Sequence, residues 1–216
     1  MAKNKLRKFA QFDAMENTFD YTMHHKGNWA QEVFKNNHRI VLELACGRGE
    51  YSNALGALYS HSNYMGIDIK GARLWKGATD ALENGLKNVA FFRAQIDHLE
   101  QFFDAGEISE LWITFPDPQP QLSRERKRLT SPKFLDIYRK ICKSDTLVNL
   151  KTDSTLLYDY TKQIIEEQGL EILEDNSDIY SGNEIKPELT FKTYYEKIWL
   201  KEGKNIKYLC FRLNKI

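Results

Sequence analysis

Short apolar runs alternate along the chain with longer amphipathic segments. The apolar runs predict strands over residues 40–45, 63–69, 88–93, 110–115, 145–152, 170–175 and 206–213. The amphipathic segments predict helices over residues 50–59, 71–84, 97–104, 131–142, 154–168 and 189–202. Regular strand–helix alternation is typical of an α/β fold with a parallel sheet. We therefore expect a seven-stranded, mostly parallel sheet with helices on both faces, closed by an antiparallel edge hairpin of the last two strands.

Polar residues mark the ends of two of these helices. Ser131 precedes Pro132, an order typical of a helix start. Ser154 or Thr155 begins the next helix, and Gly169 ends it. These signals agree with the strand boundaries on either side of each helix.

Length and composition predict one domain over residues 31–216, preceded by a partly flexible N-terminal arm over residues 1–30. The chain has 216 residues, of which 42% are hydrophobic and 12% aromatic, as in ordinary globular proteins. Its three cysteines form neither a disulfide framework nor a zinc pattern. Because neither a signal-peptide h-region nor an apolar run of about 18 residues occurs, we expect a soluble, cytoplasmic protein.

A glycine turn follows the first predicted strand. Gly47 and Gly49 lie in the segment LELACGRGE, where glycines allow positive φ angles and a close approach of backbone to ligand. Asp68 ends the second strand, 19 residues beyond Gly49. A carboxylate at that place can accept both ribose hydroxyls of an adenosine. The pattern predicts a Rossmann-like site for an adenosine-containing cofactor.

The charges beside the turn favour one cofactor over another. Glu43 and Glu50 flank it and would repel the pyrophosphate of NAD, whereas a carboxylate suits the ammonium and sulfonium of S-adenosylmethionine. Gln95, after the third strand, is placed to bind the adenine. The alternative for Glu43 is that it accepts backbone amides of the turn.

A rigid acidic loop ends the fourth strand and predicts the substrate site. Asp117 stands between two prolines in FPDP, which fix the loop, so its carboxylate can accept the N1 and N2 hydrogens of a guanine. The basic run that follows is dense enough to contact phosphates, and its members are Arg124, Arg126, Lys127 and Arg128. Further candidates at the same rim are Asp153, Thr193, Tyr195 and Glu196.

These motifs together resemble the bacterial tRNA (guanine-N7-)-methyltransferases. The matching pieces, in order, are LELACGRGE, GIDI, FPDP with the basic KRL that follows, KTDS and TxYE at residues 193–196. The resemblance covers nearly the whole chain, from residue 26 to the last strand. It implies a class I methyltransferase fold and methylation of N7 of guanosine 46 in the variable loop of tRNA, with S-adenosylmethionine as cofactor.

The resemblance also implies roles for particular residues. Cofactor binding falls to Glu43, Asp68, Gln95 and Asp117, the last also serving the reaction, while Gln121, Asp153 and residues 193–196 contact the guanosine or tRNA. The family usually has Asp at position 95, Trp at 119 and Lys at 121, where this chain has glutamines. These departures affect substrate choice more than the reaction. No metal, membrane or obligate protein partner is implied, and we expect a monomer.

Three other functions remain open at this point. One is another S-adenosylmethionine-dependent amino-methyltransferase acting on nucleic acid or protein. A second is a nonenzymatic RNA-binding module with a residual cofactor pocket. The departures from the family pattern at Gln95, Gln119 and Gln121 are the reason to consider it. The third is an NAD-dependent oxidoreductase, which ranks last because no Tyr-Lys or His-Arg catalytic pair is evident.

Overall fold

One mixed sheet of eight strands runs through the molecule. The computed structural model describes residues 2–182 and 184–214. In spatial order the strands are β1-β4-β3-β2-β5-β6-β8-β7, and β8 alone runs antiparallel to both of its neighbours. The strands are β1 (Thr18–Asp20), β2 (Ile40–Leu44), β3 (Asn63–Asp68), β4 (Val89–Arg93), β5 (Ile108–Thr114), β6 (Cys142–Thr152), β7 (Ile172–Asn176) and β8 (Lys207–Arg212).

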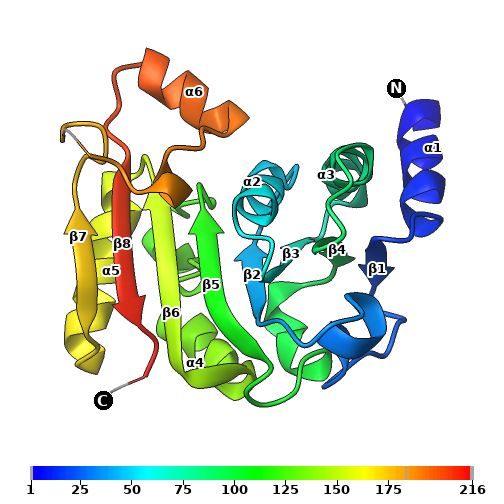
Figure 1. The fold of residues 1–216 in the computed structure, drawn as a ribbon. Helices are drawn as coiled ribbons and strands as arrows, with labels where there is room; N and C mark the ends of the chain where they lie inside the picture. The colour runs from blue at the N-terminus through cyan, green and yellow to red at the C-terminus, as the bar shows by residue number, and fades with distance from the viewer. Residues whose placement is uncertain (1, 183, 215–216) are drawn as a thin grey trace.

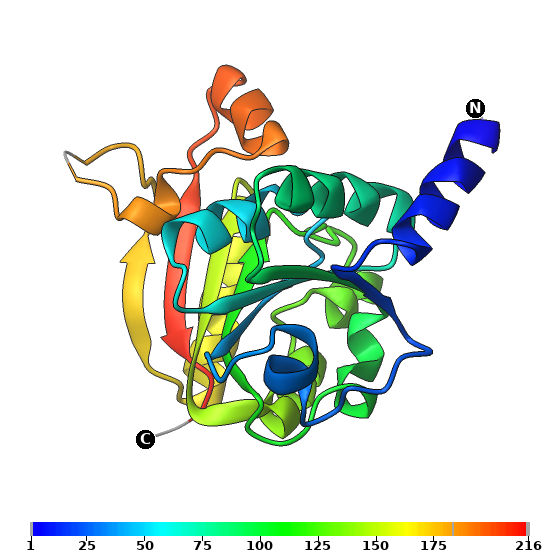
Figure 2. The ribbon, with the colours of Figure 1, turned by 45° about the vertical axis from the view of Figure 1, so that its right-hand side comes forward.

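Helices cover both faces of the sheet (Figures 1 and 2). The α-helices are α1 (Ala2–Asp13), α2 (Glu50–Leu58), α3 (Gly71–Glu83), α4 (Pro132–Ile141), α5 (Thr155–Gln168) and α6 (Tyr194–Lys201). The short helical segments are η1 (Trp29–Val33), η2 (Ile96–Gln101), η3 (Leu122–Lys127) and η4 (Pro187–Leu189). Buried side chains of α4, α5, η1 and η2 pack on one face, and those of α1, α2, α3 and η4 pack on the other.

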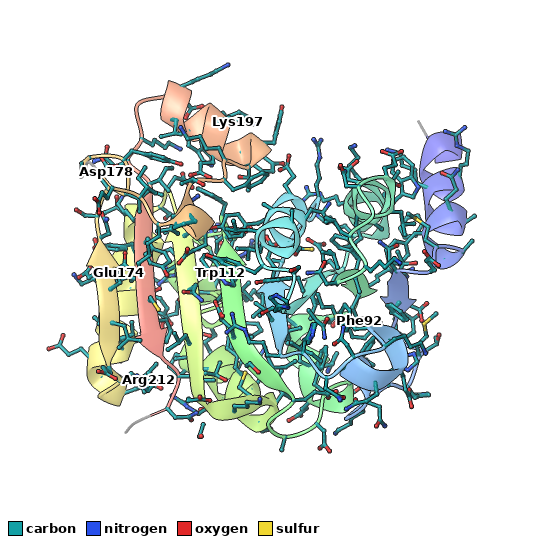
Figure 3. All side chains as sticks on the ribbon, viewed as in Figure 1. Phe92, Trp112, Glu174, Asp178, Lys197 and Arg212 are labelled. Atoms are coloured by element: carbon teal, nitrogen blue, oxygen red, sulfur yellow. The ribbon has the colours of Figure 1, made fainter. Side chains whose placement is uncertain are left out.

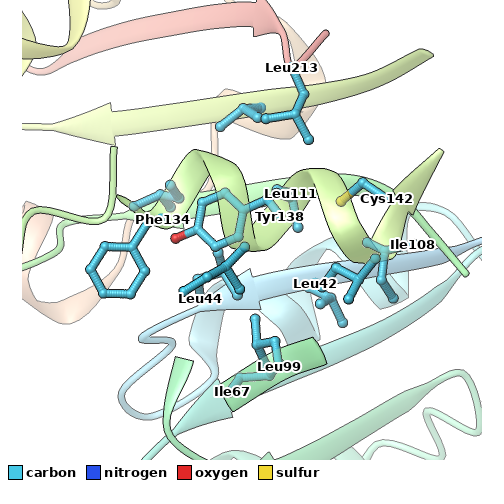
Figure 4. Packing of buried hydrophobic residues seen from close by; sticks show 14 of the residues in the cluster. Leu42, Leu44, Ile67, Leu99, Ile108, Leu111, Phe134, Tyr138, Cys142 and Leu213 are labelled. Atoms are coloured by element: carbon cyan, nitrogen blue, oxygen red, sulfur yellow. The ribbon is translucent and has the colours of Figure 1, made fainter. Parts of the chain in front are cut away.

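Two hydrophobic cores result, one on each side of the sheet. In β2, Leu42 and Leu44 face the core beneath α4, whereas Val41 faces the core beneath α2 and α3. Figure 4 shows part of the first core, with Phe134 and Tyr138 of α4 lying over the strands. Figure 3 labels one side chain of each core, Phe92 of the first and Trp112 of the second. Successive residues of each parallel strand face opposite cores, and both cores are buried. The sequences of these strands are therefore continuous apolar runs.

The predicted α/β architecture is confirmed, including all seven predicted strands and the antiparallel edge. The strand count was one too low. Residues 18–20 of the predicted arm form β1, which pairs parallel with β4 in the register Thr18 to Phe91. Further along the arm, the buried Trp29 donates its indole N–H to the carbonyl of Phe102 at 2.8 Å. The division of the chain at residue 30 stays a prediction.

The ends of both helices agree with the sequence signals, but only α5 has a side-chain cap at its start. Ser154 is the N-cap of α5, and its Oγ accepts a hydrogen bond from the Leu157 amide at 3.2 Å. Gly169 ends α5 in the left-handed conformation, with φ of 60°. Ser131 occupies the N-cap position of α4, but its hydroxyl donates to the carbonyl of Arg126 instead. Among the described residues, no helix combines the length and apolar character needed to cross a membrane.

The strand order reverses between β2 and β5. From β2 the chain builds outward through β3 and β4, and it then returns to place β5 and β6 on the other side of β2. In open α/β sheets the crevice beyond the carboxyl ends of such neighbouring strands is where ligands bind. The loops after Leu44 and Thr114 meet at this crevice.

Candidate active site

Two adjoining cavities open at the carboxyl ends of the parallel strands. The large cavity, of about 580 Å³, is lined from β3, β4 and β5 and includes Asp68, Gln95 and Asp117. The small cavity, of about 80 Å³, is lined from the glycine turn and α6 and includes Glu43, Gly47 and Thr193. Ala45, Arg73 and Phe115 line both cavities. The cleft that they form therefore brings together most of the residues singled out in the sequence.

The glycine turn has positive φ at three residues, 57° at Ala45, 59° at Gly47 and 65° at Gly49. A Cβ on Gly49 would lie 2.1 Å from Cε1 of the Phe91 ring, so this position excludes every other residue. A Cβ on Gly47 would meet nothing within 4 Å, because Gly47 faces the small cavity. One glycine is thus needed for packing, and the other leaves backbone open to a ligand.

Glu43 is buried at the point where β2 and β5 lie side by side. Its Oε2 accepts the backbone N–H of Ser52 at 2.8 Å and the Ser52 hydroxyl, and its Oε1 accepts the Thr114 hydroxyl at 2.6 Å. Burial raises the pKa of Glu43 to about 7, against the hydrogen bonds from Ser52 and Thr114. The alternative role appears in altered form, because the amide that Glu43 accepts belongs to Ser52 of α2 and not to the turn. The carboxylate retains further acceptor positions toward the small cavity.

Asp68 ends β3 and closes the turn from the other side. Its Oδ2 accepts the N–H of Gly47 at 3.1 Å, and its Oδ1 accepts the N–H of Lys70 at 2.8 Å. The side chain lines the large cavity together with the exposed Gln95, which follows β4. The structure therefore brings the two predicted adenosine-binding residues to the wall of one cavity.

Asp117 is exposed on the loop after β5, at the rim of the large cavity. Its Oδ1 accepts the N–H of Gln119 at 3.0 Å, which fixes the carboxylate within the proline-rich turn. Phe115 before it and Gln119 after it both have positive φ, 48° and 45°. Non-glycine residues in this region store strain of about 1–3 kcal/mol each, which persists only where surrounding contacts impose it.

Arg128 imposes part of that geometry. It is 3% exposed, its guanidinium donates to the carbonyls of Pro118 and Gln119 at 3.2–3.3 Å, and it stacks over the Tyr160 ring at 4.3 Å. The predicted phosphate contact of Arg128 does not agree with this burial, because its guanidinium is directed at the loop carbonyls and the Tyr160 ring. Runs of charged residues are usually solvated. In this run Arg128 instead turns inward and donates to two carbonyls of the proline-rich loop.

The rest of the basic run remains on the surface. Arg124, Arg126 and Lys127 lie on the exposed segment η3, and Lys127 also lines the large cavity beside Asp117. Gln121 precedes η3 and is exposed as well. Of these four side chains, only Lys127 lines the cleft, and the substrate contacts predicted for Gln121, Arg124 and Arg126 stay predictions.

The segment after β7 supplies two cavity-lining residues and one buried charge. Thr193 and Tyr195 line the small cavity, and Tyr195 is 48% exposed. Glu196 is fully buried and pairs with Lys151 of β6 at 2.9 Å, away from the solvent side. Asp153, after β6, pairs with Lys204 at 3.2 Å. A substrate contact by Glu196 would require that its ion pair be broken.

Sequence reasoning missed Arg73 and the partners of Glu43. Thr114 is the last residue of β5, and its hydroxyl donates to Glu43. A polar residue at the end of an apolar strand, directly before FPDP, was the signal that could have identified it. Arg73 lies in the first turn of α3 and lines both cavities. From the sequence it was treated only as part of an amphipathic helix, although it follows Asp68 by five residues. Cys46 is buried within the turn, and burial raises the pKa of its thiol well above the usual range, which disfavours the nucleophilic thiolate.

Comparison with known proteins agrees with this architecture. A family model described as "Putative methyltransferase" matches residues 37–209. A tRNA (guanine-N(7)-)-methyltransferase of Bacteroides thetaiotaomicron is 47% identical over 99% of this chain and 87% of its own length. The chain belongs to the tRNA (guanine-N(7)-)-methyltransferase family. A further member, from Christiangramia forsetii, is 44% identical and is covered over 99% of its length.

Solved structures show the same fold at low identity. The 16S rRNA methyltransferase KamB superposes with a TM-score of 0.66 at 12% identity, over 89% of this chain and 95% of that one. A SAM-dependent methyltransferase from Aquifex aeolicus gives 0.56 at 14% identity, over 81% and 82%. The predicted Rossmann-like methyltransferase fold is therefore confirmed.

Proposed function

We propose that this protein transfers the methyl group of S-adenosylmethionine to N7 of a guanosine in tRNA, at position 46 of the variable loop. The observation that carries the proposal is the cleft at the strand-order reversal, where Glu43, Asp68 and Asp117 gather around adjoining cavities. The relatives named as tRNA methyltransferases favour this activity over another amino-methyltransferase or a nonenzymatic RNA-binding module.

The residues of the cleft fit the cofactor in chemical type. Asp68 offers a carboxylate to ribose hydroxyls and Gln95 an amide to adenine, both from the wall of the large cavity. Gly47 presents backbone without a side chain, and Glu43 offers a carboxylate to a cation at the small cavity. When bound, S-adenosylmethionine supplies an electrophilic methyl group on a sulfonium.

The protein's own task is alignment more than proton transfer. Guanine N7 has a free lone pair and carries no proton, so no general base is required. Asp117 accepts the N1 and N2 hydrogens of the guanine, orients the ring and increases electron density toward N7. Phe115 lines both cavities and excludes water from the place where charge is lost during transfer.

The remaining candidates act on the rest of the substrate. Gln121, Asp153, Thr193 and Tyr195 contact the nucleoside and its neighbours, and Glu196 supports Thr193 from the buried side. Arg124, Arg126 and Lys127 contact phosphates, which offsets the few kcal/mol needed to expose a stacked base. Since one chain supplies the whole cleft, we propose that the protein acts as a monomer, in the cytoplasm where tRNA is found.

The test removes the orienting carboxylate. Asp117→Ala should lower methyl transfer about 100-fold, because loss of alignment by about 1 Å costs that much. Transfer is measured with labelled S-adenosylmethionine and unmodified tRNA, and borohydride reduction with aniline scission locates the 7-methylguanosine.

Binding of S-adenosylhomocysteine, measured by calorimetry, separates the two possible causes of a loss. Affinity within about twofold of wild type together with slow transfer supports the alignment role. Near-wild-type transfer by Asp117→Ala contradicts that role, and the absence of 7-methylguanosine with the unaltered protein contradicts the proposed function as a whole.

A further inference from the structure

A basic groove lies beside the small cavity and includes no residue of the proline-rich loop in its lining. It has a volume of about 400 Å³, and its lining residues are Lys8, Gly47, Arg48, Ala72, Arg73, Lys76 and Tyr195. These residues come from α1, the glycine turn, α3 and α6, which are far apart in the chain. In Figure 1, α1, α3, α2 and α6 lie along the same upper edge of the molecule, where the carboxyl ends of the parallel strands are found.

The groove concentrates positive charge. Four of its lining residues are cationic, and none of the described residues that line it carries a carboxylate. Lys76 pairs with Asp80 one turn along α3 at 2.5 Å, a pair that is 53% and 30% exposed. Exposed pairs of this kind are worth less than about 1 kcal/mol, so Lys76 can exchange its partner for a phosphate.

Aromatic contacts hold two of these cations in place without neutralising them. The Lys8 ammonium lies 4.4 Å from the Trp75 ring, and the Arg48 guanidinium lies 5.1 Å from the Tyr194 ring. A cation over an aromatic ring keeps its full charge and its hydrogen-bond donors. Because their positions are already defined, these side chains lose less entropy when an anion binds.

The groove is continuous with the cleft. Gly47, Arg48 and Tyr195 line both the groove and the small cavity, and Arg73 lines the groove and both cavities. Tyr195 stands between the groove and the small cavity with 48% of its surface exposed, in edge-to-face contact with Tyr194 at 5.5 Å. An exposed ring at such a boundary offers a stacking surface to a base.

We propose that this basic groove binds the phosphodiester backbone of the RNA strand next to the target guanosine, with a flanking base against Tyr195. The proposal rests on the tRNA substrate proposed above and adds a second phosphate-binding surface, built from α1, the glycine turn, α3 and α6 and sharing no lining residue with η3. An RNA strand that enters over η3 and leaves through the groove passes the small cavity, where Glu43 and Thr193 lie. Cations on both sides fix the strand at two points and so position one nucleotide between them.

The experiment neutralises the two lysines that line the groove alone. The variant Lys8→Gln/Lys76→Gln is compared with Lys87→Gln/Lys143→Gln, which removes the same charge at exposed positions near the amino ends of β4 and β6. The Kd for unmodified tRNA and the slope of log Kd against log salt are measured for both, with binding of S-adenosylhomocysteine and thermal melting as checks on the cleft and the fold.

We expect the groove variant to bind tRNA about five- to thirtyfold more weakly than the control at 0.15 M salt. Its salt slope should fall by about 1.5, since each lost phosphate contact removes about 0.7–0.9. S-adenosylhomocysteine affinity should be unchanged. Equal Kd and slope for the two variants overturn the groove while the proposed function stands, whereas wild-type protein that neither binds nor methylates tRNA overturns both.

Discussion

The buried Lys151–Glu196 ion pair should determine whether α6 stays packed against the end of β6. Both side chains are 0% exposed, and the Lys151 ammonium also donates to the carbonyls of Leu189 and Phe191 at 3.0 Å. Glu196 in turn accepts the Tyr180 hydroxyl at 2.7 Å. Nearly every polar atom of the pair is therefore satisfied, and these hydrogen-bond partners, Leu189, Phe191 and Tyr180, all lie in the segment after β7.

Lys151→Met removes the cation and leaves the Glu196 carboxylate buried without its partner. Breaking one side of a buried pair costs about 3–5 kcal/mol. For a chain of this length each kcal/mol shifts Tm by about 2–4 °C, so the variant should melt roughly 6–20 °C lower. Burial lowers the pKa of Lys151, and the Glu196 carboxylate acts in the opposite direction. The cost of breaking the pair therefore comes from the desolvated charge that is left without its partner.

The assay is urea unfolding of a double-mutant cycle. Lys151→Met/Glu196→Leu should cost about 2–3 kcal/mol less than the sum of the single variants, since the second change removes the unpaired carboxylate. The matched control is Lys204→Met, which breaks the partly exposed pair with Asp153 and should cost less than about 1 kcal/mol. Additive single effects, or a Lys151→Met cost similar to that of the control, would refute the reasoning.

Two further predictions concern the turn. Gly49→Ala should destabilise the fold by about 2–5 kcal/mol, because it combines a left-handed φ with a Cβ 2.1 Å from Phe91. Gly49→Ala/Phe91→Leu should recover part of this in thermal melting, and no recovery would exclude the clash. Glu43 has a folded pKa of about 7, above its ordinary 4.5, so its stabilising contribution is complete below pH 4.5 and is lost as pH rises through 7. The unfolding free energy of wild type minus that of Glu43→Gln should therefore fall by about 3 kcal/mol over this interval, and a flat difference would contradict the raised pKa.

Most of the sheet could be predicted because its strands are buried on both faces. Such strands appear as continuous apolar runs, as in residues 40–44, and they need no knowledge of their neighbours. β1 could not be found this way. It has three residues, Thr18–Asp20, and its only reason to be extended is the exposed edge of β4, which lies far along the chain.

In the candidate site, too, the residues that depend on local geometry were predictable, and those that depend on tertiary partners were not. Gly47, Gly49 and Asp68 were predictable because backbone geometry and strand ends determine their positions. Arg128 and Glu196 were not, because charged residues are ordinarily exposed and only tertiary partners explain their burial. The basic groove was equally hidden, since its cations come from segments that meet only in the folded molecule.

The placement of β1 has a consequence for how the chain folds during synthesis. Thr18 leaves the ribosome about 70 residues before Phe91, its partner in the sheet. At bacterial translation speeds this interval corresponds to about 4–14 s. The earliest part of the polypeptide must therefore wait, unpaired, for the sheet edge that will receive it, and Lys8 of α1 joins the groove only after α3 and β4 have been made.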